Sequence, residues 1–189
     1  INISKDRIDL REKKIFTIDG ALARDFDDAV SIDVLDGGNY YLGVHIADVS
    51  EYVTPGSALD SEAYLRGNSV YLPDRVIPML PERLSNGVCS LNPNVDRLTL
   101  SVFMEIDKSG KIVENRISKS VIRSSRRLTY EDMNRLFEND DELKAQYPDI
   151  YDDLQNMRTL AKILRKRRFE RGAVDFDFPE TEIITGSDG

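Results

Sequence analysis

Residues 28–47 read DAVSIDVLDGGNYYLGVHIA, a strand–turn–strand pattern. Residues 28–35 are rich in side chains that favour β-strands, and residues 36–39 (DGGN) tolerate the positive φ angles of a tight turn. Residues 40–47 then place every second side chain on the same face, as a returning strand does. The pattern predicts an antiparallel hairpin near the start of the chain.

The same pattern recurs further along the chain. Residues 98–106 alternate in the same way, and DKSG at 107–110 turns the chain into residues 111–122, while residues 14–19 predict one more strand. These strands predict a largely antiparallel sheet in the first half of the chain. Within the second hairpin we expect the following side chains to point inward: Leu98, Leu100, Val102, Met104 and Ile106.

Helical patterns lie between and after the strands. Residues 57–65 predict a short helix, and Thr129 predicts the N-cap of another because acidic residues follow it in the first turn. Residues 149–171 predict the longest helix, and Gly172 stands where a C-terminal glycine belongs. The sequence therefore predicts an α+β fold, a mainly antiparallel sheet flanked by helices.

A proline-rich segment separates the two predicted hairpins. Residues 71–93 read YLPDRVIPMLPERLSNGVCSLNP, and Pro73, Pro78 and Pro81 are incompatible with a regular helix or a central strand. We expect a fixed irregular loop, and ordered loops of this length are usually functional.

Composition narrows the class of protein. The chain has 189 residues, which predicts one domain, and no apolar run approaches the roughly 18 residues of a membrane span. Cys89 is the only cysteine and His45 the only histidine, which excludes an internal disulfide and a zinc cluster and predicts a cytoplasmic protein. Because the first residue is Ile1 and no signal peptide follows, we expect the chain to be internal to something longer.

The formal net charge of −8 is unevenly distributed. Residues 1–114 carry −7, residues 115–171 carry +4 and residues 172–189 carry −5. The acidic total argues against a protein that binds nucleic acid by bulk electrostatics alone. The basic side chains at the end of the predicted helix at 149–171 fit either a solvated cationic helix end or a phosphate-contacting face, and the sequence leaves both open.

The stretch DGALARDFDD at residues 19–28 concentrates four aspartates: Asp19, Asp25, Asp27 and Asp28. Like charges this close repel, and they are tolerated mainly where a cation neutralises them. Oxygen ligands without histidine or cysteine select Mg²⁺, or Mn²⁺ in its place. Neither frame of the stretch supplies the glycine and glutamate of an EF-hand loop, whereas a solvated acidic turn remains an alternative.

Four segments, in unbroken order, carry a family resemblance. They are IDGALARDFDDAVSI at 18–32, HIADVSEYVTPGSALDSEAYLRGNSVYLPDRVIPMLPERLSNGVCSLNP at 45–93, RLTY at 127–130 and ERGAVDFD at 170–177. Together they resemble the catalytic RNB domain of the RNase II and RNase R exoribonucleases, and they are most similar to the bacterial RNase R branch. The resemblance runs over nearly the whole chain, which makes it far more specific than any single motif.

The resemblance implies an activity and an active centre. It implies processive 3′-to-5′ hydrolysis of single-stranded RNA to nucleoside 5′-monophosphates, with Mg²⁺ as cofactor. In its terms all four aspartates are catalytic and bind metal: Asp19, Asp25 and Asp28 hold or orient the ions, and Asp27 is the carboxylate most critical to cleavage.

The resemblance also implies RNA contacts and missing parts. It places a stacking aromatic for the RNA 3′ end at Tyr71 and a second clamping aromatic at Phe176, although either ring could simply pack on the core. Family members add a second half of the RNB domain and flanking OB-fold domains that grip RNA. We therefore expect residues 1–189 to be the N-terminal portion of an RNB domain, weakly active or inactive alone.

Two rival functions fit part of the pattern. One is a non-catalytic RNA-binding or interaction module related to the nuclease. The other is a DxD-type nucleotide-sugar transferase, which the lack of a Gly-rich turn and of βαβ alternation disfavours. We expect His45 to be a hydrogen-bonded structural residue and Cys89 a small buried one. Five arginines fit either phosphate contacts or bonds to loop carbonyls and stay unassigned: Arg75, Arg83, Arg123, Arg126 and Arg127.

Overall fold

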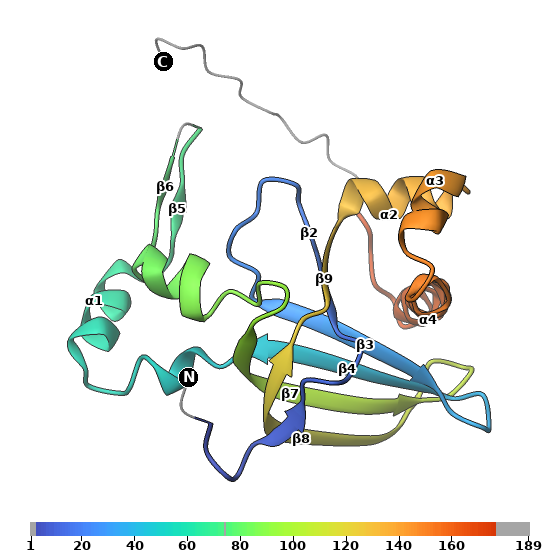
Figure 1. Cartoon of the computed structure of the whole chain (residues 1–189), viewed down its shortest axis with the longest axis horizontal. Helices are drawn as coiled ribbons and strands as arrows, with labels where there is room; N and C mark the ends of the chain where they lie inside the picture. The colour runs from blue at the N-terminus through green and yellow to red at the C-terminus, as the bar shows by residue number, and fades with distance from the viewer. Residues whose placement is uncertain (1–2, 74, 177–189) are drawn as a thin grey trace.

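A strongly curled, seven-stranded sheet carries Asp19 and Asp28 at one end of two neighbouring strands (Figure 1). The computed structural model describes residues 3–73 and 75–176. The strand order is β1-β8-β7-β4-β3-β2-β9. The strands are β1 (Ile8–Leu10), β2 (Phe16–Asp19), β3 (Asp28–Val34), β4 (Tyr40–Ala47), β7 (Asp96–Ile106), β8 (Ile112–Arg123) and β9 (Arg126–Thr129).

Both predicted hairpins are confirmed. β3 pairs with β4 from Asp28 opposite Ile46 to Val34 opposite Tyr40, and β7 pairs with β8 through the turn at 107–110. In the first turn the Leu35 N–H donates to the Asn39 carbonyl at 2.9 Å. These contacts are local in sequence, so the turn residues and the alternation are sufficient to specify them.

The sheet is mixed because β1 and β9 each add a parallel pairing. β1 pairs with β8 and β9 pairs with β2, while the other four pairings are antiparallel. Two residues, Ser124 and Ser125, connect β8 near one edge to β9 at the other. The Ser125 N–H donates to the Ile15 carbonyl at 2.7 Å, and this short connection curls the sheet. The sequence analysis missed both short strands, because their partners are distant in the chain.

Three helices, α2 (Tyr130–Phe137), α3 (Asp141–Gln146) and α4 (Tyr151–Glu170), cover one face of the sheet. Thr129 caps α2 as predicted, accepting from the Asp132 N–H at 3.1 Å, and Gly172 after α4 has φ of +92°. α3 was not predicted. Nowhere in residues 3–73 or 75–176 is a helix long and apolar enough to cross a membrane.

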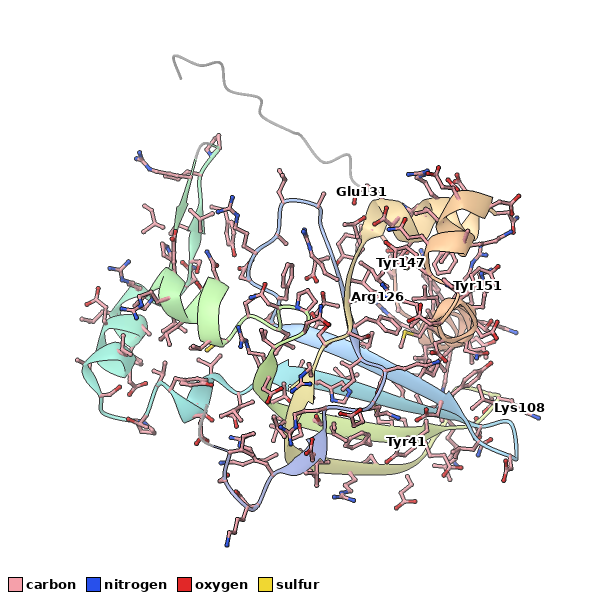
Figure 2. All side chains as sticks on the ribbon, in the orientation of Figure 1. Tyr41, Lys108, Arg126, Glu131, Tyr147 and Tyr151 are labelled. Carbon is pink, nitrogen blue, oxygen red and sulfur yellow. The ribbon has the colours of Figure 1, made fainter. Side chains whose placement is uncertain are left out.

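Arg126 ties the edge of the sheet to this helical layer. Its guanidinium lies 5.8 Å from the centre of the Tyr147 ring and donates to both carboxylate oxygens of Asp149 at 3.0 and 3.1 Å. Figure 2 shows Arg126 on the sheet side of Tyr147, beneath α2 and α3. The arginine therefore has a structural role.

The proline-rich segment forms a lobe with α1 (Ala58–Arg66), to the left in Figure 1. It contains a two-residue pairing of β5 (Val70–Tyr71) with β6 (Val76–Ile77) and a π-helical turn, η2 (Arg83–Val88). A mainly irregular path is as predicted, but the π turn was not. Behind it, Cys89 is buried with Phe26 and Leu91, which confirms the prediction for the cysteine.

The prediction for β7 was wrong at Leu100, whose side chain is 42% exposed. α4 covers this face of the sheet only near Ile32 and Ile106, so Leu100 lies beyond the helical layer. Leu98, on the same face, is buried as predicted, and on the opposite face Thr99 and Ser101 are inaccessible to solvent. Polar residues are tolerated there because they hydrogen-bond to one another across the strands.

His45 is the centre of that buried polar cluster. Its Nε2 lies 3.1 Å from the Ser31 hydroxyl and its Nδ1 lies 2.6 Å from the Ser101 hydroxyl, which continues to Ser120 at 2.6 Å. Gly43 leaves room for it, because a Cβ there would meet Ser31 Oγ at 2.4 Å and His45 Nε2 at 2.9 Å. The prediction that His45 is structural is confirmed.

We expect Gly43→Ala to lower the free energy of unfolding by about 1–3 kcal/mol, because the methyl group overpacks the His45 cluster. Urea denaturation measures the change. Gly37→Ala is the matched control, since nothing lies within 4 Å of a Cβ at that position. Equal effects of the two substitutions would contradict the packing argument.

Burial lowers the pKa of His45 to about 4, and the charge of Lys13 adds to the effect. The unfolded chain, with an ordinary histidine pKa near 6.5, therefore binds more protons between about pH 6.5 and pH 4. We expect stability to fall through that window on acidification, with His45 contributing up to roughly 3 kcal/mol of the loss. Urea midpoints of wild type and His45→Gln should converge as the pH falls; parallel profiles would refute the assignment.

Candidate active site

The four predicted aspartates lie at and between the ends of two neighbouring strands. Asp19 is the last residue of β2 and Asp28 the first of β3, and the strands run antiparallel with Phe16 opposite Val30. Asp25 and Asp27 lie on the connecting segment, residues 20–27, which we call the aspartate loop. The four aspartates therefore lie at and between the two strands that the sequence predicts at residues 14–19 and 28–35.

The negative charge of Asp27 affects the ionisation of two neighbouring aspartates, Asp19 and Asp28. Burial raises the pKa of Asp19, and the negative charges of Asp28 and Asp27 raise it further. Burial likewise raises the pKa of Asp28, again with the charge of Asp27 adding to it. Negative charge is therefore concentrated where the two strands end, and a cation bound there would stabilise the ionised form.

Asp19 also has an unsatisfied oxygen. In the described part of the chain, its Oδ2 atom is buried and has no hydrogen-bond partner. A buried carboxylate oxygen without a donor is costly, and a bound hard cation removes that cost. The oxygen-only donor set of Asp19, Asp27 and Asp28 fits Mg²⁺ or Mn²⁺. Within residues 3–73 and 75–176, however, no three acidic, histidine or cysteine side chains already form a metal-binding cluster.

Arg127 on β9 holds the aspartate loop in place. Its Nη2 donates to the carbonyls of Gly20, Ala21 and Ala23 at 3.2, 2.5 and 3.4 Å. Its guanidinium also lies 5.1 Å from the centre of the Phe26 ring. The sequence left this arginine unassigned, and the structure shows the second of its two open roles, bonding to loop carbonyls. Because 107 residues separate it from Gly20, no spacing rule could have found it.

The other side of the loop is held by residues that follow η2. The Ser90 hydroxyl donates to the Arg24 carbonyl at 2.7 Å and accepts from the Phe26 N–H at 3.1 Å. The Leu91 N–H donates to the Phe26 carbonyl at 2.8 Å, and the Phe26 side chain is only 3% exposed. The loop backbone is thus fixed around buried Phe26, while the flanking Asp25 and Asp27 are exposed.

Asp25 and Tyr71 both line a pocket of about 690 Å³ beside the aspartate loop. Tyr71 lies on β5 and is 70% exposed, so its ring is available for a ligand. Arg24 and Arg75 line the same pocket, which therefore combines an aromatic ring with cations beside a carboxylate. The structure therefore places Tyr71 in the same pocket as one of the four aspartates.

A second pocket of about 690 Å³ lies against the other side of the loop. It shares Ala23, Arg24, Glu82 and Asn86 with the first, and adds Arg83 and Arg127. The sequence analysis did not single out Asn86 or Glu82, which belong to the proline-rich segment whose functional importance it did predict.

Phe176 lies elsewhere. It is 70% exposed and belongs to the stretch that follows α4, where Asp175 accepts from Arg165 Nη2 at 2.6 Å. It is not among the residues that line either pocket beside the aspartate loop. The structure therefore does not bring Phe176 together with Tyr71.

Comparison with known proteins gives a consistent result. A family model described as RNB domain matches residues 7–189. Ribonuclease R 1 of Lactococcus lactis is 52% identical over 183 residues, covering 97% of this chain and 22% of the relative. Ribonuclease R of Thermotoga maritima is 53% identical over 184 residues, covering 97% and 26%.

A solved structure agrees with these relatives. Mycoplasma genitalium RNase R in complex with ribose methylated single-stranded RNA superimposes with a TM-score of 0.88 at 33% identity, covering 97% of this chain and 28% of that one. The chain spans about a quarter of the length of the relatives it matches. Since the family model covers nearly all of its residues, the chain belongs to the RNB domain family.

Proposed function

We propose that this chain is the N-terminal portion of the catalytic domain of a Mg²⁺-dependent exoribonuclease. The enzyme would hydrolyse single-stranded RNA processively from its 3′ end and release nucleoside 5′-monophosphates. The observation that carries the proposal is the group of carboxylates at the ends of β2 and β3, where burial and the charges of Asp28 and Asp27 raise the pKa of Asp19. Membership of the RNB family and about 50% identity to ribonucleases R support it.

The reaction needs a water nucleophile and a stabilised leaving group. A water oxygen bonds to the phosphorus of the 3′-terminal nucleotide and the water gives up a proton. The bond from that phosphorus to the 3′ oxygen of the preceding nucleotide breaks, and that oxygen takes up a proton. Bound Mg²⁺ would supply activation of the water and compensation of the developing charge. Following the resemblance, we assign the holding and orienting of the ion to Asp19, Asp25 and Asp28, and the most direct effect on cleavage to Asp27. In the structure, Asp19 and Asp28 lie with Asp27, and Asp25 lines the adjoining pocket.

The chain's own residues would orient the RNA. The exposed Tyr71 ring beside Asp25 offers a stacking surface next to the carboxylates. Stacking is tolerant of sequence because every base has a π-face, at about 1–3 kcal/mol per base. A stacking surface of this kind suits degradation that does not depend on base sequence. We also propose Phe176 as a second RNA contact.

The second candidate function is a non-catalytic RNA-binding or interaction module. It is favoured by the absence, within the described residues, of a formed three-ligand metal cluster. The chain covers 22–28% of the three relatives described above. We therefore propose that the rest of the RNB domain and flanking OB-fold domains complete the site and the RNA grip. We also propose that the complete protein is cytoplasmic. On this view residues 1–189 alone have little or no activity. Robust processive release of monophosphates by the isolated chain would contradict that dependence.

Asp27→Asn in the complete protein should lower RNA hydrolysis by on the order of a hundredfold or more, because charge stabilisation at a metal centre supplies several kcal/mol. Release of monophosphates from a labelled single strand measures it. In the isolated chain, we expect calorimetry to detect Mg²⁺ binding by wild type and none by Asp27→Asn with Asp28→Asn. Asp36→Asn, in the far turn between β3 and β4, is the control and should change neither. Unaltered hydrolysis by Asp27→Asn would remove the catalytic assignment.

Arg127→Ala in the complete protein should lower hydrolysis by roughly ten- to a hundredfold, because the aspartate loop loses its brace. Added guanidinium should restore part of the activity, whereas a variant that merely misfolds would gain nothing. Arg123→Ala is the matched control, since Arg123 pairs with Asp96 away from the loop. If guanidinium rescues both variants or neither, the positioning role of Arg127 is lost.

A further inference from the structure

The last turns of α4 and the turn between β7 and β8 form a basic surface outside the proposed active site. The last turns of α4 carry Arg165, Lys166, Arg167 and Arg168, the helix ends at Glu170, and Arg171 lies just beyond. The turn approaches the helix closely, because Arg167 Nη1 donates to the Gly110 carbonyl and a Cβ on Gly110 would meet Ile163 Cγ2 at 2.9 Å. Figure 2 shows Lys108 at this end of the sheet, away from the aspartate loop.

A groove of about 570 Å³ runs between these elements. Its floor is apolar, with Leu42, Met104 and Leu164, and no carboxylate lines it. Four cations do: Lys111, Arg167, Arg168 and Arg171. A neighbouring pocket of about 470 Å³ shares Leu164 and Arg168 and adds Arg165, Phe169 and Asp175. We call the continuous surface formed by Lys111, Arg165, Arg167, Arg168, Phe169 and Arg171 the cationic strip.

The charges of the cationic strip are only partly balanced. Arg165 pairs with Asp175 at 2.6 Å, but among the described residues no ion pair involves Lys111, Arg168 or Arg171. A helix dipole accounts for cations in the last turn of α4, at about 0.3–1 kcal/mol each. It does not account for Lys111, which lies on a different element and lines the same groove. In a chain of net charge −8, this accumulation calls for an anionic ligand.

We propose that the cationic strip binds the phosphate backbone of single-stranded RNA upstream of the 3′ end that occupies the active site. This inference rests on the proposed function. The strip lies at the far end of the strands from the aspartates: Asp28 begins β3, Val34 ends it, and Val34 pairs with Tyr40, which pairs with Ile106. Six residues of strand separate the two ends by about 20 Å. RNA several nucleotides long would therefore be needed to reach both places.

The surface chemistry favours a nucleic acid strand over an acidic protein. Phe169 is 40% exposed and the Arg165 guanidinium lies 5.6 Å from its ring centre, so an aromatic face stands among the cations. Cations interleaved with exposed aromatic rings are typical of surfaces that bind single strands. The hydrogen bond from Arg165 to Asp175 holds the segment after α4 against the helix. Phe176, our proposed RNA contact, is the next residue in the chain after Asp175.

The test compares two variants of the complete protein with equal changes in charge. Arg168→Glu with Arg171→Glu alters the strip. Lys5→Glu with Arg116→Glu is the control, because Lys5 precedes β1 and Arg116 lies on β8 opposite Phe103, on the face away from α4. Fluorescence anisotropy with a labelled RNA of about 20 nucleotides, in EDTA to prevent cleavage, gives affinity as a function of salt. Hydrolysis of an RNA of about four nucleotides is measured separately.

We expect the strip variant to bind the long RNA at least roughly tenfold more weakly at low salt, with a salt slope reduced by about 1.4 for two lost phosphate contacts. Hydrolysis of the short RNA should be retained. Equal affinity of the strip and control variants for the long RNA would overturn the inference. Binding of polyglutamate by wild type as tightly as RNA would also overturn it, because the strip would then be assigned to an acidic protein. Failure of wild type to hydrolyse either RNA would instead overturn the proposed function.

Discussion

The pairing of β9 with β2 is the contact on which the site depends. It spans four residues of each strand, from Phe16 opposite Arg126 to Asp19 opposite Thr129. Because successive side chains of a strand point to opposite faces, Arg126 reaches the helical layer while Arg127 reaches the aspartate loop. One short parallel pairing therefore fixes both the helices and the loop relative to β2.

Arg127 forms its hydrogen bonds with backbone carbonyls and not with the aspartates, so the site stays electronegative. Elsewhere in the chain aspartates are neutralised by arginines: hydrogen bonds from Arg11 lower the pKa of Asp9 to about 2, and Arg7 pairs with Asp48 at 2.6 Å. Arg127, although close to Asp19, donates to backbone carbonyls instead. It therefore stabilises the shape of the loop and offsets little of its charge, which leaves a requirement that a divalent cation can meet.

The elements that the sequence predicts are those specified by neighbouring residues. Alternation and the turn at 36–39 predict the first hairpin, and the Thr129 cap predicts the start of α2. The aspartate loop could be recognised because its charges are adjacent in sequence. β9 and the bracing role of Arg127 could not, because each depends on a partner more than 100 residues away. Leu100 shows a related limit, since alternation indicates the face of a strand but not whether a helix covers it.

A net charge of −8 and an RNA substrate are compatible because the charges are separated in space. Interactions between exposed charges are screened over about 8–10 Å at moderate ionic strength, whereas about 20 Å of strand lies between the aspartate loop and the cationic strip. Each therefore acts on its own ligand with little influence from the other. The total charge governs only the weak field at long range, so local geometry decides where a polyanion can bind and where a cation is needed.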